Sequence, residues 1–389
     1  MEKFNIGIIG IGDISDVYIK NLQKYKDEVT VLGCASRGIE KAKAKAEMFG
    51  IPRYYASGDE LIEDPDIDIV LNLTIPEVHY DYNKKALEGG KHVYSEKPLA
   101  STFEQGKELL KIAERKGFCI GCAPDTFMGG RLQTYKKLID NGTLGKVFGA
   151  TVTSVSHGGE WFHPNPAFFY QPGAGPLYDI GPYYMTALLS ILGPVKRIQA
   201  MCTTAEQERV IESGPRKGER IKVSPEVSTH VVANLEFKEG TVATVIMSFE
   251  VWDSELPRME IYGTKGTLTM QEPDPCDGPN LFGGDVLLRT RDNYRWKELP
   301  RNPEDLQKPW TKVPVTHDHN SVSHAENSRG IGLIDMVQAI NEKREARASG
   351  AMALHLLEVM EGIIRSARER HEVKTTTDFS VPGLLPEKF

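Results

Sequence analysis

The chain lacks the features that mark secreted, membrane-spanning and nucleic-acid-binding proteins. Its five cysteines are scattered through 389 residues, an odd and sparse set that suits a reducing compartment better than a disulfide framework. No run approaches the roughly 18 apolar residues of a membrane span. There are 47 basic against 54 acidic residues, so the excess of positive charge expected for a nucleic-acid-binding protein is missing. No leader-like apolar stretch opens the sequence, and we expect a cytoplasmic protein.

The chain does have the length for two domains, and its pattern changes near residue 124. Before that point short apolar runs alternate with helical patterns. Strands are predicted at 4–11, 29–35, 53–56, 67–73, 92–95 and 118–122, with helices at 14–25, 39–49, 80–88 and 103–116. Strands that alternate with helices form parallel sheets through crossover helices. Residues 1–124 are therefore predicted to form a Rossmann domain with a doubly wound parallel sheet.

The remaining residues, 125–389, have a strand-rich pattern with hairpin turns at 238–240 and 263–266. Strands are predicted at 147–156, 195–203, 229–237, 241–249, 258–262 and 267–271, and helices at 128–141, 177–192, 332–347 and 350–370. This pattern predicts an α+β domain with a large, mainly antiparallel open sheet.

A glycine turn, Gly10-Ile11-Gly12-Asp13-Ile14-Ser15, lies between the first predicted strand and helix. The first glycine allows a tight turn, and the second lets the backbone approach a pyrophosphate at the positive end of the helix. We therefore predict a dinucleotide site that includes Gly10, Gly12, Asp13 and Ile14. Ser15 stands where the fingerprint has glycine or alanine, and an ordinary strand-to-helix turn is the alternative.

The end of the second predicted strand bears on which dinucleotide binds. An acidic residue there would bind a ribose 2′-hydroxyl, whereas an arginine would accommodate a 2′-phosphate. The segment has Ser36, which can donate a hydrogen bond, and Arg37, which can pair with phosphate. NADP is therefore favoured over NAD. The alternative is that Arg37 is a solvated residue at the start of a helix.

Glu96-Lys97-Pro98 follows the fifth predicted strand, at the carboxyl edge of the sheet, where open α/β sheets bind ligands. A lysine in such a place can act as a general base. Together with the glycine turn, this tripeptide resembles the glucose–fructose oxidoreductase, inositol dehydrogenase and rhizopine-catabolism (Gfo/Idh/MocA) family. The resemblance covers nearly the whole chain and rests on the segments 10–12, 72–79, 96–98, 138–147 and 173–183.

The resemblance implies an NAD(P)-dependent dehydrogenase or reductase that moves a hydride between nicotinamide and a sugar, polyol or cyclic diol. Lys97 would exchange a proton with the reacting hydroxyl and contact the nicotinamide ribose, and the Lys97–Pro98 bond would be cis. The other implied cofactor contacts are Thr74, Pro76, His79 and Glu96. No metal is needed, because the hydride passes directly. The family's second domain binds substrate and its sheet commonly joins subunits, which implies a homodimer or homotetramer.

Asp179 and Tyr183 match the family's Asp-x-x-x-His pair, with tyrosine in place of histidine. Residues four apart share a helix face, so both are predicted to face the substrate. Asp179 would orient Lys97 or a substrate hydroxyl, and Tyr183 would donate to the reacting oxygen. A phenol is a poor base at neutral pH, which leaves Lys97 as the main acid–base residue. The alternative for Tyr183 is a structural role.

The segment 157–163 precedes this pair and contains His157, Trp161 and His163, which we predict to contact a polyol. The spacing of the histidines fits no standard metal set. Asp125 is a second departure, because many relatives carry asparagine there. Three alternatives stay open at this point: a reductase or dihydrodiol dehydrogenase, a dinucleotide-binding sensor or co-regulator without turnover, and an oxidoreductase that keeps its nucleotide throughout the cycle.

Overall fold

The computed structural model describes residues 2–163, 165–271, 281, 283–295, 304, 308–317 and 328–389. The chain forms two compact units. The first comprises 1–128, 327–361 and 377–383, and the second comprises 129–326, 362–376 and 384–389. Two segments from the C-terminal part of the sequence therefore pack with the N-terminal unit. The functional boundary at 124/125 stays a prediction.

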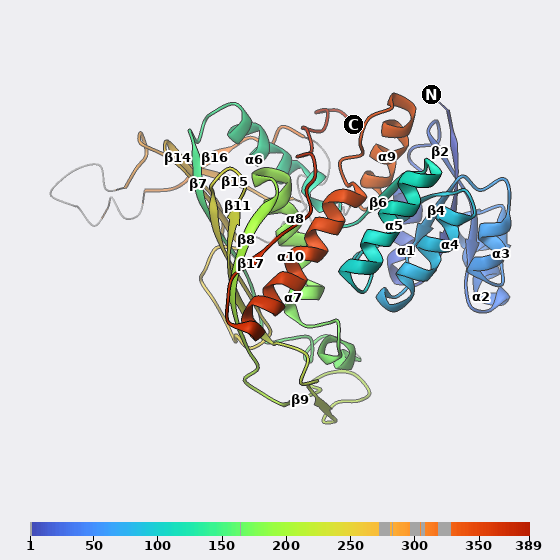
Figure 1. The fold of residues 1–389 in the computed structure, drawn as a ribbon, viewed down its shortest axis with the longest axis horizontal. Helices are drawn as coiled ribbons and strands as arrows, with labels where there is room; N and C mark the ends of the chain where they lie inside the picture. Colours follow the sequence, from blue (N-terminus) through green and yellow to red (C-terminus); the bar gives the residue numbers. More distant parts are fainter. Residues whose placement is uncertain are drawn as a thin grey trace. The chain divides into compact units, whose positions relative to one another are not determined.

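The first unit is built on a six-stranded parallel sheet with the order β3-β2-β1-β4-β5-β6 (Figure 1). Its strands are β1 (Phe4–Ile9), β2 (Val29–Ala35), β3 (Arg53–Tyr55), β4 (Ile69–Asn72), β5 (His92–Ser95) and β6 (Ile120–Cys122). Its helices are α1 (Asp13–Leu22), α2 (Ile39–Phe49), α3 (Gly58–Glu63), α4 (His79–Glu88), α5 (Phe103–Lys116) and α9 (Ile331–Glu342), with single turns at Pro76–Val78 and Thr126–Met128. The predicted doubly wound sheet is confirmed, and its order reverses between β1 and β4.

Local sequence signals explain the bounds of these elements. The side chain of Thr102 caps α5 by accepting a hydrogen bond from the backbone N–H of Gln105, and Gly117 ends the helix in the left-handed region with φ of 75°. All four residues of β4 are buried, as expected for a strand covered on both faces. Helix α10 (Gly350–Glu369) contributes residues 350–361 to this unit.

The second unit is built on a nine-stranded sheet with the order β16-β15-β14-β13-β7-β12-β11-β8-β17. Its strands are β7 (Val147–Val155), β8 (Val195–Thr203), β11 (His230–Phe237), β12 (Val242–Ser248), β13 (Met259–Gly263), β14 (Gly266–Met270), β15 (Val286–Thr290), β16 (Thr311–Val313) and β17 (Val373–Lys374). Strands β9 (Glu208–Val210) and β10 (Arg220–Lys222) form a separate hairpin, and the helices are α6 (Gly130–Asp140), α7 (Pro176–Asp179) and α8 (Gly181–Leu192), with a turn at Pro166–Tyr170. The sheet is mostly antiparallel, as predicted, except that β7 and β12 run parallel.

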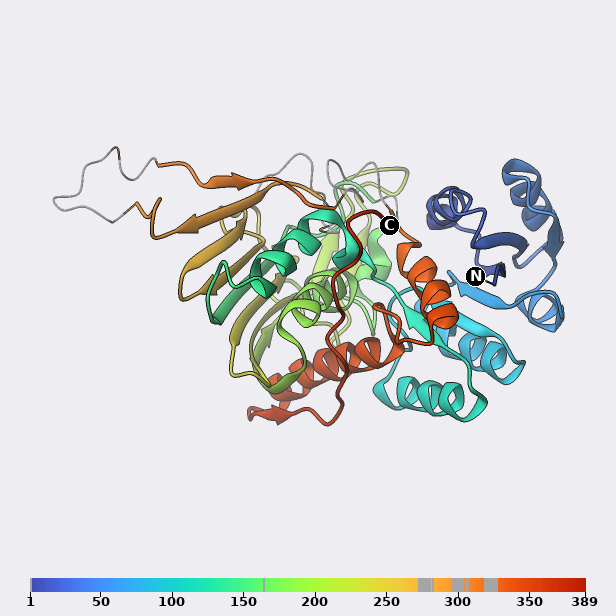
Figure 2. The same ribbon diagram turned by 90° about the horizontal axis from the view of Figure 1, so that it is seen from above.

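One face of the nine-stranded sheet carries the core of this unit. Along β11, Val231, Ala233 and Leu235 are buried, while the residues between them point to the other face. Figures 1 and 2 show α6 and α8 on one face and no described helix on the other. The uncovered face presents large apolar side chains, including Met201, which is 82% exposed. We call it the open sheet face.

The helix predicted at 177–192 is wrong in one respect, because the chain divides it at Ile180. Pro182 has no backbone N–H, and its ring would clash with the carbonyl four residues earlier in a continuous helix. Helix α8 therefore starts anew at Gly181, and all twelve of its residues are buried. No helix in the described part of the chain is long and apolar enough to cross a membrane.

Candidate active site

The glycine turn has the geometry of a phosphate-binding turn. Gly10 has φ of 92°, and a Cβ at this position would lie 2.6 Å from the backbone of Leu73, so glycine is required. A Cβ at Gly12 would meet nothing within 4 Å, which leaves the start of α1 open to a ligand. Ser15 is buried, and its hydroxyl donates to the carbonyl of Gly12 over 2.6 Å. The serine is thus accommodated in the third place of the fingerprint.

Strand register brings three predicted segments to one edge of the parallel sheet. The N–H of Leu73 donates to Ile9 over 2.7 Å, and the N–H of Glu96 donates to Asn72 over 2.8 Å. The glycine turn, Thr74 and the Glu96-Lys97-Pro98 segment therefore follow three adjacent strands at their carboxyl ends. This edge, at the reversal of strand order, is where doubly wound sheets bind dinucleotides.

The end of β2 meets the same edge. Ser36 is half-buried and Arg37 is exposed, directly before Gly38, which has φ of 113°. The guanidinium of Arg37 makes no ion pair or hydrogen bond within the described structure. Both residues therefore follow β2 at the same sheet edge as the glycine turn.

The predicted contacts Thr74 and His79 form a hydrogen-bonded support. The hydroxyl of Thr74 donates to the buried side chain of Asn72 over 2.6 Å. The imidazole of His79 is fully buried and lies between two carbonyl oxygens, at 2.7 Å from that of Pro98 and 2.9 Å from that of Thr74. His79 therefore joins the loop after β4 to the loop after β5. Pro76 is exposed in the first of these loops.

Glu96 fixes the backbone of Lys97. One carboxylate oxygen accepts the N–H of Lys97 over 2.9 Å, and the other accepts the hydroxyl of Tyr18 over 2.8 Å. Arg329 lies 4.0 Å from the same carboxylate. The Lys97–Pro98 peptide bond is cis, as the family resemblance predicts, and the Lys97 side chain is half-buried.

Asp125 has a structural partner that the sequence did not reveal. Its carboxylate is fully buried and accepts the N–H groups of Gly330 and Gly332 over 2.9 Å each, which caps α9. A Cβ at Gly332 would lie 2.1 Å from the hydroxyl of Tyr94, so only glycine fits there. Burial raises the pKa of Asp125 to about 6, against the lowering effect of these hydrogen bonds and of Arg329.

The second unit contains a pocket of about 800 Å³ whose walls combine aromatic and polar side chains. The rings of His157 and Trp252 stack with centroids 3.4 Å apart and an angle of 17° between their planes. Trp161 and Trp252 are 63% and 77% exposed, which is unusual for such large apolar groups. The acidic and basic side chains in the wall are Asp179, Glu212, Asp253 and Arg258. We call this cavity the aromatic pocket.

A buried ionic network holds the loops of the aromatic pocket. Arg209 donates to the carboxylate of Glu160 over 2.6 Å and to that of Glu250 over 2.7 Å. It also donates to the backbone carbonyls of His157 and Phe249, over 3.0 and 3.1 Å. The segment before Trp252 and the segment carrying His157 are thereby joined through one guanidinium.

The remaining predicted substrate contacts have different positions in this unit. Asp179 ends α7 and lines the aromatic pocket. Tyr183 is 7% exposed within α8 and does not line it, whereas its neighbour Tyr184 does. The prediction that Asp179 and Tyr183 share a helix face assumed one continuous helix, whereas Asp179 ends α7 and Tyr183 lies in α8. His163 also lies outside the wall of this pocket, among the rings of Phe168 and Phe169.

Several pocket residues were not found from the sequence. Trp252, Tyr184 and Arg258 were not singled out, although a tryptophan directly after an alternating strand was a usable signal. Arg209 gave no signal, because its partners lie 49 and 41 residues away in the sequence.

This fold and this glycine turn define a dinucleotide-binding oxidoreductase. The sequence matches the model of the oxidoreductase family with an NAD-binding Rossmann fold, GFO/IDH/MocA, over residues 4–123, and that of the GFO/IDH/MocA C-terminal domain over residues 132–269. The chain belongs to the GFO/IDH/MocA oxidoreductase family.

Relatives and solved structures agree with this assignment. The chain is 25% identical over 317 residues to a D-xylose dehydrogenase of Paenarthrobacter nicotinovorans, which covers 76% of this chain and 79% of the relative. It is 24% identical over 264 residues to a myo-inositol 2-dehydrogenase of Thermotoga maritima, with 68% and 74% covered. The fold is similar to that of levoglucosan dehydrogenase in complex with NADH and L-sorbose, with a TM-score of 0.78, 20% identity, and 96% and 99% covered.

Proposed function

We propose that this protein transfers a hydride between a nicotinamide dinucleotide and the CH–OH carbon of a sugar, polyol or cyclic diol. The observation that carries this proposal is the placement of Lys97 at the carboxyl edge of the sheet, next to the open glycine turn and with its backbone fixed by Glu96. When bound, the nicotinamide supplies the carbon that accepts or donates the hydride. Lys97 takes the hydroxyl proton during oxidation and returns it during reduction.

Two features of the first unit support the proposal that it binds NADP. Gly12 leaves space at the N-terminus of α1 for a pyrophosphate, and the backbone dipole there favours negative charge. At the end of β2, the exposed Arg37 and the hydroxyl of Ser36 would pair with a 2′-phosphate, and no acidic residue stands there to bind a 2′-hydroxyl. We therefore propose a preference for NADP over NAD.

The aromatic pocket supports a polyhydroxylated substrate. Exposed tryptophan rings offer flat apolar surfaces for the C–H face of a sugar, and carboxylates can accept hydrogen bonds from neighbouring hydroxyls. Trp252, Trp161 and Asp179 provide these groups. Asp179 would orient a substrate hydroxyl or Lys97. For Tyr183 we retain the proposal of a hydrogen bond to the reacting oxygen.

The test is a steady-state survey of purified protein with sugars, inositols and cyclic diols, each with NADP and NAD. We expect turnover of at least one polyol, with a larger kcat/KM for NADP. Lys97→Met should lose this activity by about 100-fold or more, as for other general bases, while still binding NADP. Lys107→Met, an exposed lysine on α5, is the matched control. Binding of NADP without turnover of any compound, in the native protein and Lys97→Met alike, would instead indicate a sensor or co-regulator.

We also propose that the part of the open sheet face formed by β12, β11 and β8 joins two subunits, which leaves the part formed by β13, β14 and β15 uncovered. Strands β12 and β8 contribute large apolar side chains to this face, and Val242 and Met201 are 49% and 82% exposed. A contiguous exposed apolar surface on a sheet is typical of protein interfaces. A homodimer is the simplest assembly that covers it.

A further inference from the structure

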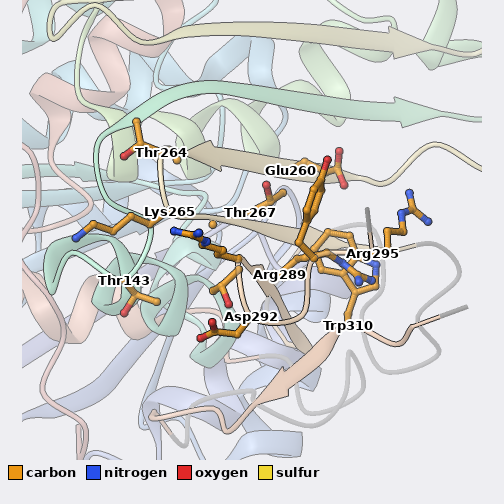
Figure 3. Close-up of a pocket in the computed structure, with 14 residues that line it drawn as sticks. Thr143, Glu260, Thr264, Lys265, Thr267, Arg289, Asp292, Arg295 and Trp310 are labelled. Atoms are coloured by element: carbon orange, nitrogen blue, oxygen red, sulfur yellow. The ribbon is translucent and has the colours of Figure 1, made fainter. Parts of the chain in front are cut away.

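The open sheet face carries a second pocket, of about 930 Å³, that shares no lining residue with the aromatic pocket. Glu260 pairs with Thr151 across the sheet, and Thr267 pairs with Arg289, which places these side chains on the open face. The turn between β13 and β14 and the segment after β15 form its walls. Figure 3 shows Thr143, Thr264 and Lys265 on one side and Arg295 and Trp310 on the other. We call it the basic pocket.

Arg289 is the fixed element of the basic pocket. Only 8% of the residue is exposed, and its two terminal nitrogens donate to the carbonyls of Asn293 and Lys308 over 2.9 Å each. The guanidinium lies 4.6 Å from the centre of the Trp310 ring. No carboxylate of the described residues pairs with it, and its Nε has no hydrogen-bond partner there. Burial, together with the positive charge of Arg295, lowers the pKa of Arg289.

An arginine buried without a counter-ion is costly, because its charge is removed from water without compensation. In the basic pocket, neighbouring cationic side chains add further positive charge. Lys265 and Arg291 are exposed and form no ion pair in the part of the chain that the structure describes. Among the described residues, four cationic side chains and two carboxylates line the pocket. One of the carboxylates, that of Glu260, already accepts the hydroxyl of Tyr262 over 2.7 Å.

We propose that the basic pocket binds a small dianionic compound, such as a phosphate ester or a dicarboxylate, separately from the cofactor and the substrate. Guanidinium and ammonium groups bind such oxyanions through charge-assisted hydrogen bonds. The two hydrogen bonds of Arg289 to backbone carbonyls fix the position of its guanidinium. The threonine hydroxyls in the wall add neutral donors, and the Trp310 ring closes the back of the site. Two negative charges on the ligand would pair with Lys265 and Arg291, which form no ion pair among the described residues.

The test uses isothermal titration of the full-length protein with inorganic phosphate and with succinate, at constant ionic strength adjusted with sodium chloride. The double variant Lys265→Gln/Arg291→Gln changes only exposed side chains and should fold normally. We expect it to weaken the binding of both anions by about tenfold, from the loss of two surface charge contacts. Lys217→Gln/Lys222→Gln makes the same change of charge at exposed positions outside the pocket and should alter binding less than twofold.

Three results would overturn the proposal. One is the absence of binding of either anion at millimolar concentration. Another is equal weakening in the two double variants, which would indicate a general effect of charge. The third is loss of phosphate binding in Arg37→Ala but not in Lys265→Gln/Arg291→Gln, because the phosphate would then occupy the proposed NADP site. Failure of the NADP proposal itself leaves the basic pocket unaffected, since Arg37 lies in the other unit.

Discussion

The guanidinium of Arg209 and the carboxylate of Glu160 form an ion pair of 2.6 Å in which both side chains are almost completely buried, at 2% and 5% exposure. Two charges so far from water are tolerable only when each is paired and hydrogen-bonded. Here the pair also binds the backbone of the segment that carries His157. The shape of the aromatic pocket thus depends on an interaction beneath its surface.

Replacement of Arg209 by alanine should therefore destabilise the protein strongly. Glu160 and Glu250 would lose their buried counter-ion, and we expect the free energy of unfolding to fall by about 3–5 kcal/mol. Urea denaturation followed by circular dichroism would measure it. Arg220→Ala, which breaks an exposed pair with Glu208, is the control and should cost at most about 1 kcal/mol. Similar costs for the two variants would contradict the assigned role of Arg209.

Loss of the stacked ring at Trp252 should weaken substrate binding and leave the cofactor unaffected. We expect Trp252→Ala to raise KM for the polyol by about tenfold, in line with the removal of a large aromatic contact, with the Kd of NADP within twofold. Trp252→Phe should recover part of the loss, because a flat ring remains. Met48→Ala removes another exposed apolar side chain, on α2, and should change neither constant. An unchanged KM in Trp252→Ala would exclude the aromatic pocket as the substrate site.

Tyr18 is predicted to be a positioning residue that acts on Lys97 through Glu96. Tyr18→Phe removes one hydroxyl from a fully buried ring, so the loss should be that of one hydrogen bond. We expect kcat to fall by about 3–10-fold and the pH profile of kcat to shift, at unchanged Kd for NADP. Tyr54→Phe, on the half-exposed ring in β3, is the control. A fall in stability without any change in the pH profile would show a structural role alone.

The raised pKa of Asp125 predicts that its contribution to stability falls as the pH rises. A carboxylate with a lowered pKa has the opposite effect. The folded protein holds the proton of Asp125 up to a pKa of about 6, whereas the unfolded chain releases it near pH 4. The folded state therefore binds more protons in this window, and the contribution of Asp125 to stability falls as the pH rises from 4 to 6.

Asp125→Asn should flatten this slope, because the amide oxygen can still accept the N–H groups of Gly330 and Gly332 without a charge. Asp125→Ala should cost about 1–3 kcal/mol at every pH, since both donors lose their acceptor. Thermal unfolding between pH 4 and pH 8 would separate the two variants. A slope that is the same in Asp125→Asn as in the native protein would contradict the assignment.

The open sheet face should control assembly. Ile246 lies on β12 in the middle of this face, and Ile246→Glu would place a charge where two subunits are proposed to meet. We expect sedimentation velocity to show a dimer or tetramer for the native protein and a monomer for the variant. Lys222→Glu, on the separate hairpin, is the control. A native protein that sediments as a monomer would overturn the proposed interface.

The Rossmann unit was predictable because its signals are local. Strands β2 and β5 have the predicted bounds, since each is a short apolar run closed by polar or glycine-rich turns. The glycine turn and Lys97 were placed on one sheet edge by the same argument, and the strand register confirms that placement.

The second unit was harder to predict from the sequence, because the contacts that determine its fold join residues that are distant in sequence. The parallel pairing of β7 with β12 joins strands almost a hundred residues apart, and hydrophobic alternation contains no information about such partners. The division of the predicted helix before Pro182 was readable from the proline, and Asp125 was recognised as a departure but not as the cap of α9. Buried pairs such as Arg209 and Glu160 become visible only in three dimensions.

The capping of α9 by Asp125 has a consequence for folding during synthesis on the ribosome. The first unit includes residues 327–361, so the dinucleotide-binding sheet is synthesised long before the helix that completes its core. While the ribosome synthesises the intervening two hundred residues, the side of the sheet that α9 later covers stays exposed to solvent. Nascent chains should therefore acquire protease resistance in the N-terminal region only after α9 has left the exit tunnel, and a chain shortened before residue 328 should never acquire it.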